Sequence, residues 1–178
     1  MRYAALLRGI NVGGNKKIAM AELREVLTGL GYTDVTTYLQ SGNAVFTAPK
    51  RSAQALARVL EDTIADRFGM KVSVVIRTGE ELADVLGRNP LPGAPENPSR
   101  FFVAFLSGVP DPARTSEIEA QSFGEDRIWV SGSEAFLWCP AGAADTQLTN
   151  NLIEKRLGVT ATSRNWNTVN KLVSLTSA

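Results

Sequence analysis

The residues best suited to chemistry lie in one polar segment near the N-terminus. It reads Arg8-Gly-Ile-Asn-Val-Gly-Gly-Asn-Lys-Lys17 and so combines glycines and amides with three cations. Glycines allow a ligand to approach the backbone closely, and amide and ammonium groups donate hydrogen bonds to anions. A helix predicted just after the segment would add free N–H groups and the positive end of its dipole. We therefore predict that this loop binds a small anionic ligand, bearing phosphate or carboxylate, or nucleic acid.

The same segment also has a purely structural explanation. It matches neither the GxxxxGK[ST] phosphate loop nor the GxGxxG dinucleotide loop. Glycine and asparagine also build irregular turns, in which Lys16 and Lys17 would be solvated charges. Two alternatives stay open: a structural or interaction protein that forms oligomers, and an enzyme that uses neither histidine nor cysteine in catalysis.

Two absences narrow the chemistry further. The chain has no histidine, which excludes a histidine general base and histidine-ligated metal. Its single cysteine, Cys139, excludes an intrachain disulfide and a thiolate zinc site. Cys139 closes the apolar run that begins at Ala135, so we predict a buried thiol. No cofactor and no metal are expected.

A second candidate site lies near the C-terminus, in the segment Ser163 to Lys171. Trp166, Val169 and Leu172 follow helical spacing, which favours a helix docked on the fold. The functional alternative is a cleft between two repeats, with Arg77 as the counterpart of the arginine in the tail. The residues of this second candidate are Arg164, Asn165, Trp166 and Asn167.

Hydrophobic spacing predicts the elements that position these residues. In the first half, apolar and β-branched runs predict strands at 3–8, 35–40, 43–47 and 71–77. Helices are expected at 20–30 and 53–68, with Ser52 as the cap of the second and Gly69 as its end. A third helix is expected to start at Thr78. The order β-α-β-β-α-β is that of ferredoxin-like domains.

The order recurs after a proline-rich stretch. Residues 89–99 hold four of the eight prolines and are predicted to be a linker. Strands are then expected at 101–106, 127–130, 134–139 and 159–162, with one helix starting at Asp111 and another over 148–157. Residues from about 167 are predicted to be helical. The predicted domains are therefore 1–88 with a connecting helix, and 100–178 with a C-terminal helix.

Matching landmarks indicate an internal duplication. Ser41-Gly42 recurs as Ser131-Gly132, and Arg67-Phe-Gly69 recurs as Arg156-Leu-Gly158. The first strand maps onto 101–106 with a larger offset, so the first copy carries about nine extra residues there. The predicted fold class is thus α+β, with two tandem ferredoxin-like subdomains, and the extra length falls in the loop that contains Gly13 and Gly14.

In a βαββαβ unit the first two strands run parallel, with the third antiparallel between them. The loop after the first strand and the turn after the second therefore open at the same edge of the sheet. The predicted ligand-binding residues are Arg8, Asn11, Gly13, Gly14, Asn15, Lys16, Lys17, Gln40, Ser41 and Asn43.

Bulk properties set broader limits. The net charge of +1 argues against a surface dominated by contacts to a phosphate backbone. The sequence shows no signal peptide and no membrane span, so a soluble cytoplasmic protein without membrane contact is expected. Possible partners are a small anionic ligand, nucleic acid, or further copies of the chain.

Four segments resemble the bacterial family known as domain of unknown function 1697. They are LLRGINVGG at Leu6–Gly14, MAELREVL at Met20–Leu27, YLQSGNAVF at Tyr38–Phe46 and RNWNTVNKL at Arg164–Leu172. The resemblance covers nearly the whole chain and implies a fold of two α+β subdomains. It implies no reaction, because the family has no established activity.

Overall fold

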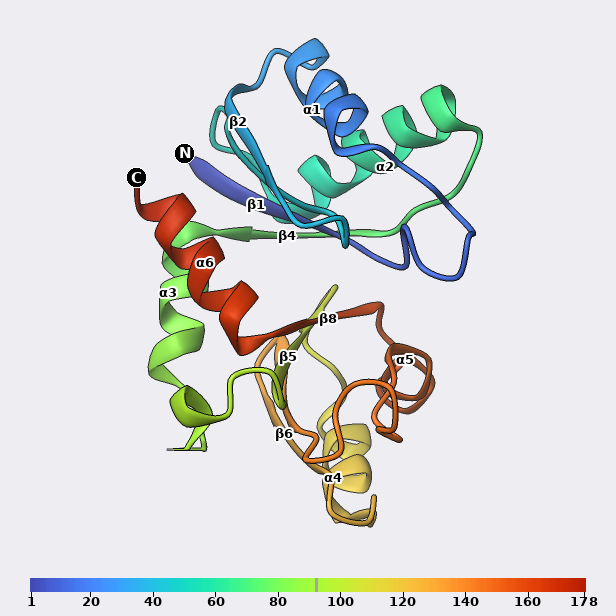
Figure 1. The fold of residues 1–178 in the computed structure, drawn as a ribbon, viewed down its shortest axis with the longest axis vertical. Coiled ribbons are helices and arrows are strands. Elements are labelled where there is room, and N and C mark those ends of the chain that lie inside the picture. The colour runs from blue at the N-terminus through green and yellow to red at the C-terminus, as the bar shows by residue number, and fades with distance from the viewer. Residues whose placement is uncertain (92) are drawn as a thin grey trace. The chain divides into compact units, whose positions relative to one another are not determined.

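The computed structural model describes residues 1–91 and 93–178 (Figure 1). The chain divides into two compact units. Unit 1 comprises Met1–Ala83 together with Leu172–Ala178, and unit 2 comprises Asp84–Lys171. Among the described residues, no helix is long and apolar enough to cross a membrane.

Unit 1 is a four-stranded antiparallel sheet with two helices. Its elements are β1 (Arg2–Leu7), α1 (Met20–Gly29), β2 (Thr33–Tyr38), β3 (Asn43–Thr47), α2 (Ala53–Phe68) and β4 (Val74–Thr78). The strand order is β2-β3-β1-β4. Both β1 and β2 pair antiparallel with β3, so they run parallel to each other on either side of it, as predicted.

The core of unit 1 lies between one face of this sheet and the two helices. Alternate β1 residues such as Tyr3 and Leu7 pack there with Phe46, whose ring stacks on Tyr32 at a centroid distance of 4.8 Å. The helices contribute apolar stripes that repeat every three or four residues. The buried helical residues are Met20, Leu23, Val26, Leu27, Leu56, Leu60 and Ile64.

The predicted ends of α2 are confirmed. The Ser52 side chain accepts a hydrogen bond from the Ala55 N–H at 3.2 Å, and the helix ends at Gly69 with φ +67°. A glycine suits this left-handed position because other residues pay a steric cost there.

Unit 2 repeats the order of elements. They are β5 (Phe101–Leu106), α4 (Pro112–Ala120), β6 (Arg127–Ser131), β7 (Glu134–Trp138), α5 (Asn150–Leu157) and β8 (Ala161–Asn165). The strand order is β6-β7-β5-β8, again antiparallel throughout. Asp111 caps α4 by accepting from the Ala113 N–H at 2.8 Å, and Gly158 ends α5 with φ +72°. The fold is therefore mixed α+β, with two four-stranded antiparallel sheets.

Of the three remaining helices in the described part of the chain, two contain a boundary between the units and one lies within unit 2. They are α3 (Gly79–Gly87), the short 3-10 helix η1 (Ala94–Glu96) and α6 (Trp166–Ser177). The division into units falls inside α3 and inside α6, whereas the sequence predicted domains ending at 88 and starting at 100. One residue of the predicted linker 89–99, Pro92, lies outside the described residues.

Several predicted boundaries shift by a few residues. The strand predicted at 35–40 is Thr33–Tyr38, and the turn after it spans four residues, 39–42, instead of two. The strand predicted at 71–77 is Val74–Thr78. Its pairing stops at Val74 because Leu7, its partner, is the last residue of β1.

Candidate functional site

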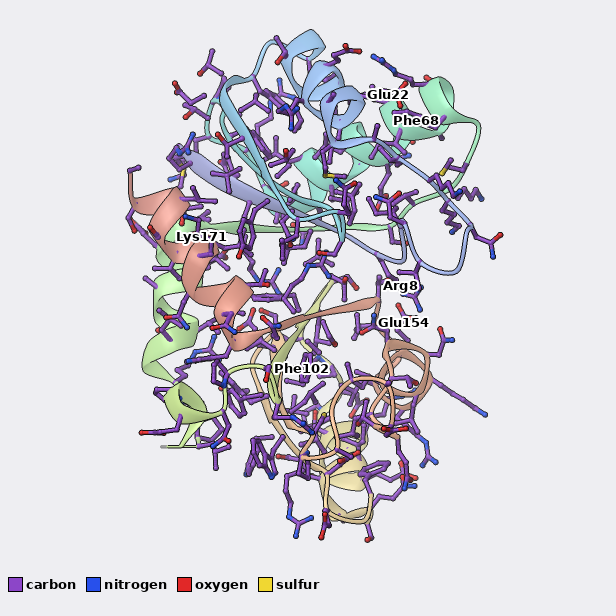
Figure 2. The ribbon with its side chains drawn as sticks, in the orientation of Figure 1. Arg8, Glu22, Phe68, Phe102, Glu154 and Lys171 are labelled. Carbon is purple, nitrogen blue, oxygen red and sulfur yellow. The ribbon has the colours of Figure 1, made fainter. Side chains whose placement is uncertain are left out.

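Three connections meet at one end of the sheet in unit 1. They are residues 8–19 after β1, 39–42 between β2 and β3, and 69–73 before β4, and we call them together the basic rim. The first begins at Arg8, immediately beyond the end of β1 (Figure 2). Backbone hydrogen bonds join them, from the Leu7 N–H to the Gly42 carbonyl and from the Arg8 N–H to the Ser73 carbonyl, both at 2.9 Å. The loop and the turn that the sequence placed at one edge therefore lie together.

Within residues 8–19 the chain folds into a small hairpin. Val12 and Asn15 form an isolated antiparallel bridge, and the two residues between them, Gly13 and Gly14, have φ +62° and +79°. Two successive positive φ values define the tight turn that glycine pairs favour. The glycines are thus explained by the turn, without a ligand that approaches their backbone.

Asn11 fixes the base of this hairpin. Its side-chain amide donates to the carbonyls of Ile18, at 3.0 Å, and Gln40, at 2.6 Å, while its oxygen accepts from the Ile18 N–H at 3.0 Å. These bonds close the loop on itself and attach it to the 39–42 turn. Asn11 is therefore a positioning residue within the predicted site.

The two lysines of the loop are exposed to solvent, whereas Arg8 is partly buried. Lys16 and Lys17 are exposed, and the Lys16 ammonium donates to the carbonyl of Lys71 at 2.7 Å. This bond brings the exposed Lys71 into the same group. The loop does not line either of the two pockets described in the structure, of about 410 Å³ at Met1–Arg2 and about 300 Å³ at Phe123–Ile128. The lysines of the rim are exposed and line neither of these two pockets.

The helix that follows the loop, α1, contributes less to the candidate anion site than the sequence predicted. α1 begins at Met20, and its N-cap, Ala19, has no side chain that can accept a hydrogen bond. Its first turn carries Glu22, whose carboxylate already complements the positive end of the helix dipole. The lysines therefore carry the positive potential of this surface.

The basic rim differs in charge from the corresponding connections of unit 2. The basic rim contains Arg8 and three lysines and no acidic residue. In unit 2 the corresponding bonds run from Leu106 to Ser133 and from Ser107 to Thr160. The connections that they join, 107–111, 132–133 and 158–160, contain one acid, Asp111, and no cation. The same architecture thus presents a basic edge in unit 1 only.

The 39–42 turn holds its shape through Asn43 and carries an exposed leucine. The buried Asn43 amide donates to the Tyr38 carbonyl at 2.7 Å and to the Ser41 hydroxyl at 3.0 Å. Leu39 has φ +61° and is 53% exposed. A left-handed conformation costs a side chain such as leucine about 1–2 kcal/mol, and exposure returns none of that cost.

The second candidate, in the tail, is mainly structural in unit 2. The Asn165 oxygen accepts from the Thr168 N–H at 3.0 Å and so caps α6. Trp166 is buried and meets the Phe101 ring edge-on at 5.2 Å, while Asn167 is exposed. These contacts agree with the helix-docking interpretation of the segment.

Arg164 differs from its neighbours because its charge is buried. Its guanidinium donates to the Thr162 hydroxyl at 2.7 Å and to the Ser163 carbonyl at 2.9 Å. Desolvation lowers the pKa of Arg164 to about 10, so the group remains charged at neutral pH. Arg77 lies opposite Ala4 on β1, and Arg164 lies opposite Val103 on β5, so the predicted counterparts occupy matching strand positions.

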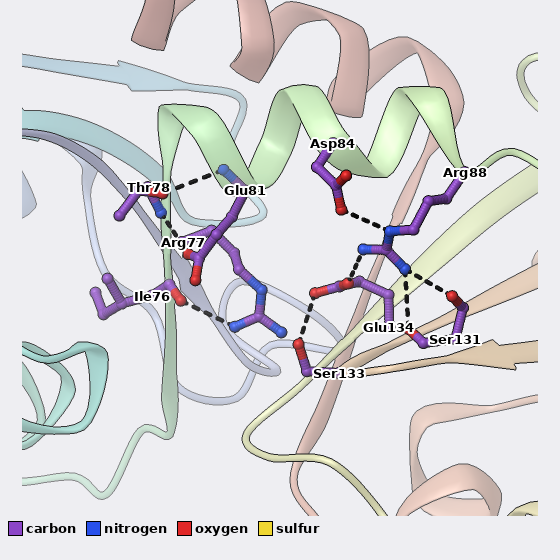
Figure 3. Close-up of polar contacts among 9 residues, drawn as sticks. All are labelled: Ile76, Arg77, Thr78, Glu81, Asp84, Arg88, Ser131, Ser133 and Glu134. Atoms are coloured by element: carbon purple, nitrogen blue, oxygen red, sulfur yellow. Dashed lines mark hydrogen bonds and ion pairs between the residues drawn. The ribbon is translucent and has the colours of Figure 1, made fainter.

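A partly buried cluster of ion pairs in unit 2 was missed by sequence reasoning. The Arg88 guanidinium contacts the carboxylates of Asp84 and Glu134 and both oxygens of Ser131 (Figure 3). Burial alone would lower the pKa of Arg88, but hydrogen bonds to Glu134 and Asp84 raise it above its ordinary value. A signal was present, because Glu134 is a charged residue that opens an otherwise apolar strand.

The structure offers no evident metal site in the part of the chain that it describes. No group of three or more acidic or cysteine side chains is gathered there at a distance suited to one ion. The single thiol, Cys139, is buried as predicted, and desolvation raises its pKa.

Comparison with known proteins identifies the family. The family model described as "Protein of unknown function (DUF1697)" matches residues 1–136, so the chain belongs to this family. The matched range includes the loop, the turn and the first three of the four resembling segments. No curated protein matches the chain.

One solved structure is similar over almost its whole length. It is the conserved bacterial protein SP0830 from Streptococcus pneumoniae, which shares 28% sequence identity with this chain. The two superpose with a TM-score of 0.77, and the match covers 98% of each chain. The similarity extends through both units.

Proposed function

We propose that the protein binds anions carrying phosphate or carboxylate groups through the basic rim of unit 1, with nucleic acid as one further candidate ligand. One observation carries the proposal: three exposed lysines, Lys16, Lys17 and Lys71, lie on connections that contain no acid. The matching connections of unit 2 have no cation, so the sheet architecture itself does not demand this charge.

The geometry limits the strength of each contact. An exposed ammonium gains only about 1 kcal/mol from a neighbouring anion in water, and salt screens that gain. A single phosphate would therefore bind weakly, at about millimolar concentration. Ligands with several negative groups are favoured, because each additional contact adds to the first.

Pyrophosphate and tripolyphosphate are suitable probes. We expect both to shift the amide resonances of residues 12–17 and of Lys71 in NMR titrations at low salt, with tripolyphosphate binding tighter. Replacing Lys16 and Lys17 by alanine should weaken binding at least tenfold, since each lost contact of about 1 kcal/mol costs about fivefold. The melting temperature should hardly change, because both side chains are exposed.

A matched control uses lysines outside the rim. Lys50 and Lys155 are also exposed, so the variant Lys50→Ala with Lys155→Ala removes the same charge. It should bind both probes as the wild type does. If the two double variants lose affinity equally, or if neither loses any, the rim is not the binding site.

We also infer that the two units are ferredoxin-like repeats from an internal duplication. Each has the element order β-α-β-β-α-β and the same antiparallel strand order. Further support comes from paired details: Gly69 and Gly158 both end helices in the left-handed conformation, and Arg77 and Arg164 occupy matching positions. The charge difference between the two rims would then be a later specialisation of unit 1.

A further inference from the structure

We propose that the basic rim docks on an anionic phospholipid surface, with Val12 and Leu39 entering the headgroup layer and the lysines contacting lipid phosphates. This inference rests on the anion binding proposed above and names the source of the anions. It requires no spanning segment, because a soluble fold can attach to a bilayer through loops at its surface.

The apolar part of the surface consists of two loop tips. Val12 is 68% exposed on the small hairpin of residues 8–19, and Leu39 is 53% exposed on the 39–42 turn. The bond from the Asn11 amide to the Gln40 carbonyl, at 2.6 Å, holds these two tips on one edge of unit 1. Two exposed aliphatic side chains thus belong to the same basic rim as the three exposed lysines.

The conformation of Leu39 argues for a role outside the fold. Its left-handed backbone, with φ +61°, is one that glycine or asparagine adopts at lower cost. Its side chain is half exposed and is not part of the core cluster of unit 1. Stability of the isolated protein therefore does not explain a leucine at this position, whereas contact with an apolar phase does.

The chemistry of the rim favours lipid over other polyanions. Proteins that bind single-stranded nucleic acid stack bases on aromatic rings, and the rim contains no aromatic residue. A stable protein–protein interface usually buries a large area around tryptophan, tyrosine or arginine side chains, and the rim contains neither tryptophan nor tyrosine. A bilayer surface needs only a few aliphatic side chains and a cluster of lysines, which is what this edge presents.

This inference departs from the expectation of no membrane contact. That expectation rested on the lack of a hydrophobic segment long enough to span a bilayer. Hydropathy does not show which single residues on loops are exposed, so the sequence could not predict membrane contact of this kind.

Vesicle binding by the full chain tests the proposal. We expect sedimentation with vesicles of phosphatidylcholine and phosphatidylglycerol, and little with phosphatidylcholine alone. The variant Val12→Ser with Leu39→Ser should lower the partition coefficient at least tenfold, because it removes two apolar side chains from the interface. The same variant keeps Lys16, Lys17 and Lys71, so its affinity for pyrophosphate should fall by much less than its partition onto vesicles.

Val109 provides the matched control. It is 75% exposed on the corresponding connection of unit 2, where no cation accompanies it. Val109→Ser should leave vesicle binding unchanged. In addition, an environment-sensitive dye attached to Leu39→Cys should shift to the blue on anionic vesicles, and the same dye on Val109→Cys should not. The native Cys139 is buried and will not compete for the label.

The outcomes separate this inference from the proposed function. Pyrophosphate binding without vesicle binding would overturn the lipid proposal and leave anion binding in place. Vesicle binding that survives the Val12 and Leu39 substitutions, or an unshifted dye at position 39, would overturn insertion of the tips. Tighter binding to a single-stranded oligonucleotide than to vesicles would favour nucleic acid instead. Failure to bind either pyrophosphate or vesicles would remove both proposals.

Discussion

Gly42 is the point at which the architecture of the basic rim can be tested most directly. It ends the turn before β3, with φ +89°, and its carbonyl accepts from the Leu7 N–H at 2.9 Å. A Cβ atom added there would lie 2.8 Å from Cδ1 of Ile10 and 2.9 Å from Cβ of Leu7. Both neighbours are buried at 1% exposure, so they have little room to move.

Gly42→Ala should therefore cost free energy in two ways. The positive φ costs an alanine about 1–2 kcal/mol. Overpacking against Ile10 and Leu7 adds about 1–3 kcal/mol. The expected loss in the free energy of unfolding is about 2–5 kcal/mol in all. Because Ile10 lies in the 8–19 connection, the clash should also displace the lysines and weaken pyrophosphate binding.

Gly132→Ala separates the two contributions. Gly132 has φ +61° in the turn between β6 and β7, and a Cβ atom there would meet nothing within 4 Å. The free energy of unfolding of Gly132→Ala should fall only by the cost of the positive φ, about 1–2 kcal/mol. Urea unfolding of both variants, followed by circular dichroism, measures the difference. Equal destabilisation of the two variants would refute the packing argument for Gly42.

Two further predictions concern other residues. Asn11→Ala should lower the free energy of unfolding by about 1–3 kcal/mol, because the side-chain hydrogen bonds to Ile18 and Gln40 are lost. Hydrogen exchange of the Ile18 amide should also accelerate. An unchanged exchange rate would contradict the positioning role of Asn11. Burial raises the pKa of the Cys139 thiol above its ordinary value of 9.0. Near pH 9 the thiol therefore stays protonated in the folded protein, while it ionises in the unfolded chain. The free energy of unfolding should thus fall as the pH rises through that value, and Cys139→Ala should remove this part of the pH dependence. Thiol reagents should label Cys139 only after denaturation. Fast labelling of the native protein would show that the thiol is accessible.

Much of the fold could be predicted because local chemistry and tertiary structure agree. Ser52, Gly69, Asp111 and Gly158 stand where helices begin or end, and each does what its residue type favours. The apolar runs of β1 and β5 are buried on both faces and were readable as strands for that reason. The ends of the strands were harder to predict. The start of β4, for example, depends on where its partner strand β1 ends.

The candidate site could be predicted in position but not in detail. Spacing was enough to place the 8–19 loop beside the 39–42 turn, since parallel strands end at one edge. The internal hairpin of the loop depends on Asn11, whose side-chain bonds span 29 residues to Gln40. Leu39 is exposed in a turn where its own backbone has a positive φ. Neither feature leaves a local pattern in the residue types.

The C-terminal segment could not be assigned from its own sequence. Trp166, Val169 and Leu172 indicated a docked helix, and α6 has that spacing. Its last residues, Leu172–Ala178, nevertheless belong with unit 1, where the Leu175 carbonyl accepts from the Arg2 guanidinium at 3.0 Å. Helical periodicity shows which face is apolar but does not identify the surface that it meets.

This division of the chain has a consequence for biosynthesis. A nascent polypeptide leaves the ribosome from its N-terminus, yet unit 1 contains both Met1–Ala83 and the much later segment Leu172–Ala178. All of Asp84–Lys171 is translated before Arg2 can meet the Leu175 carbonyl. Unit 2 is complete once Lys171 has been translated, whereas unit 1 at that point still lacks Leu172–Ala178.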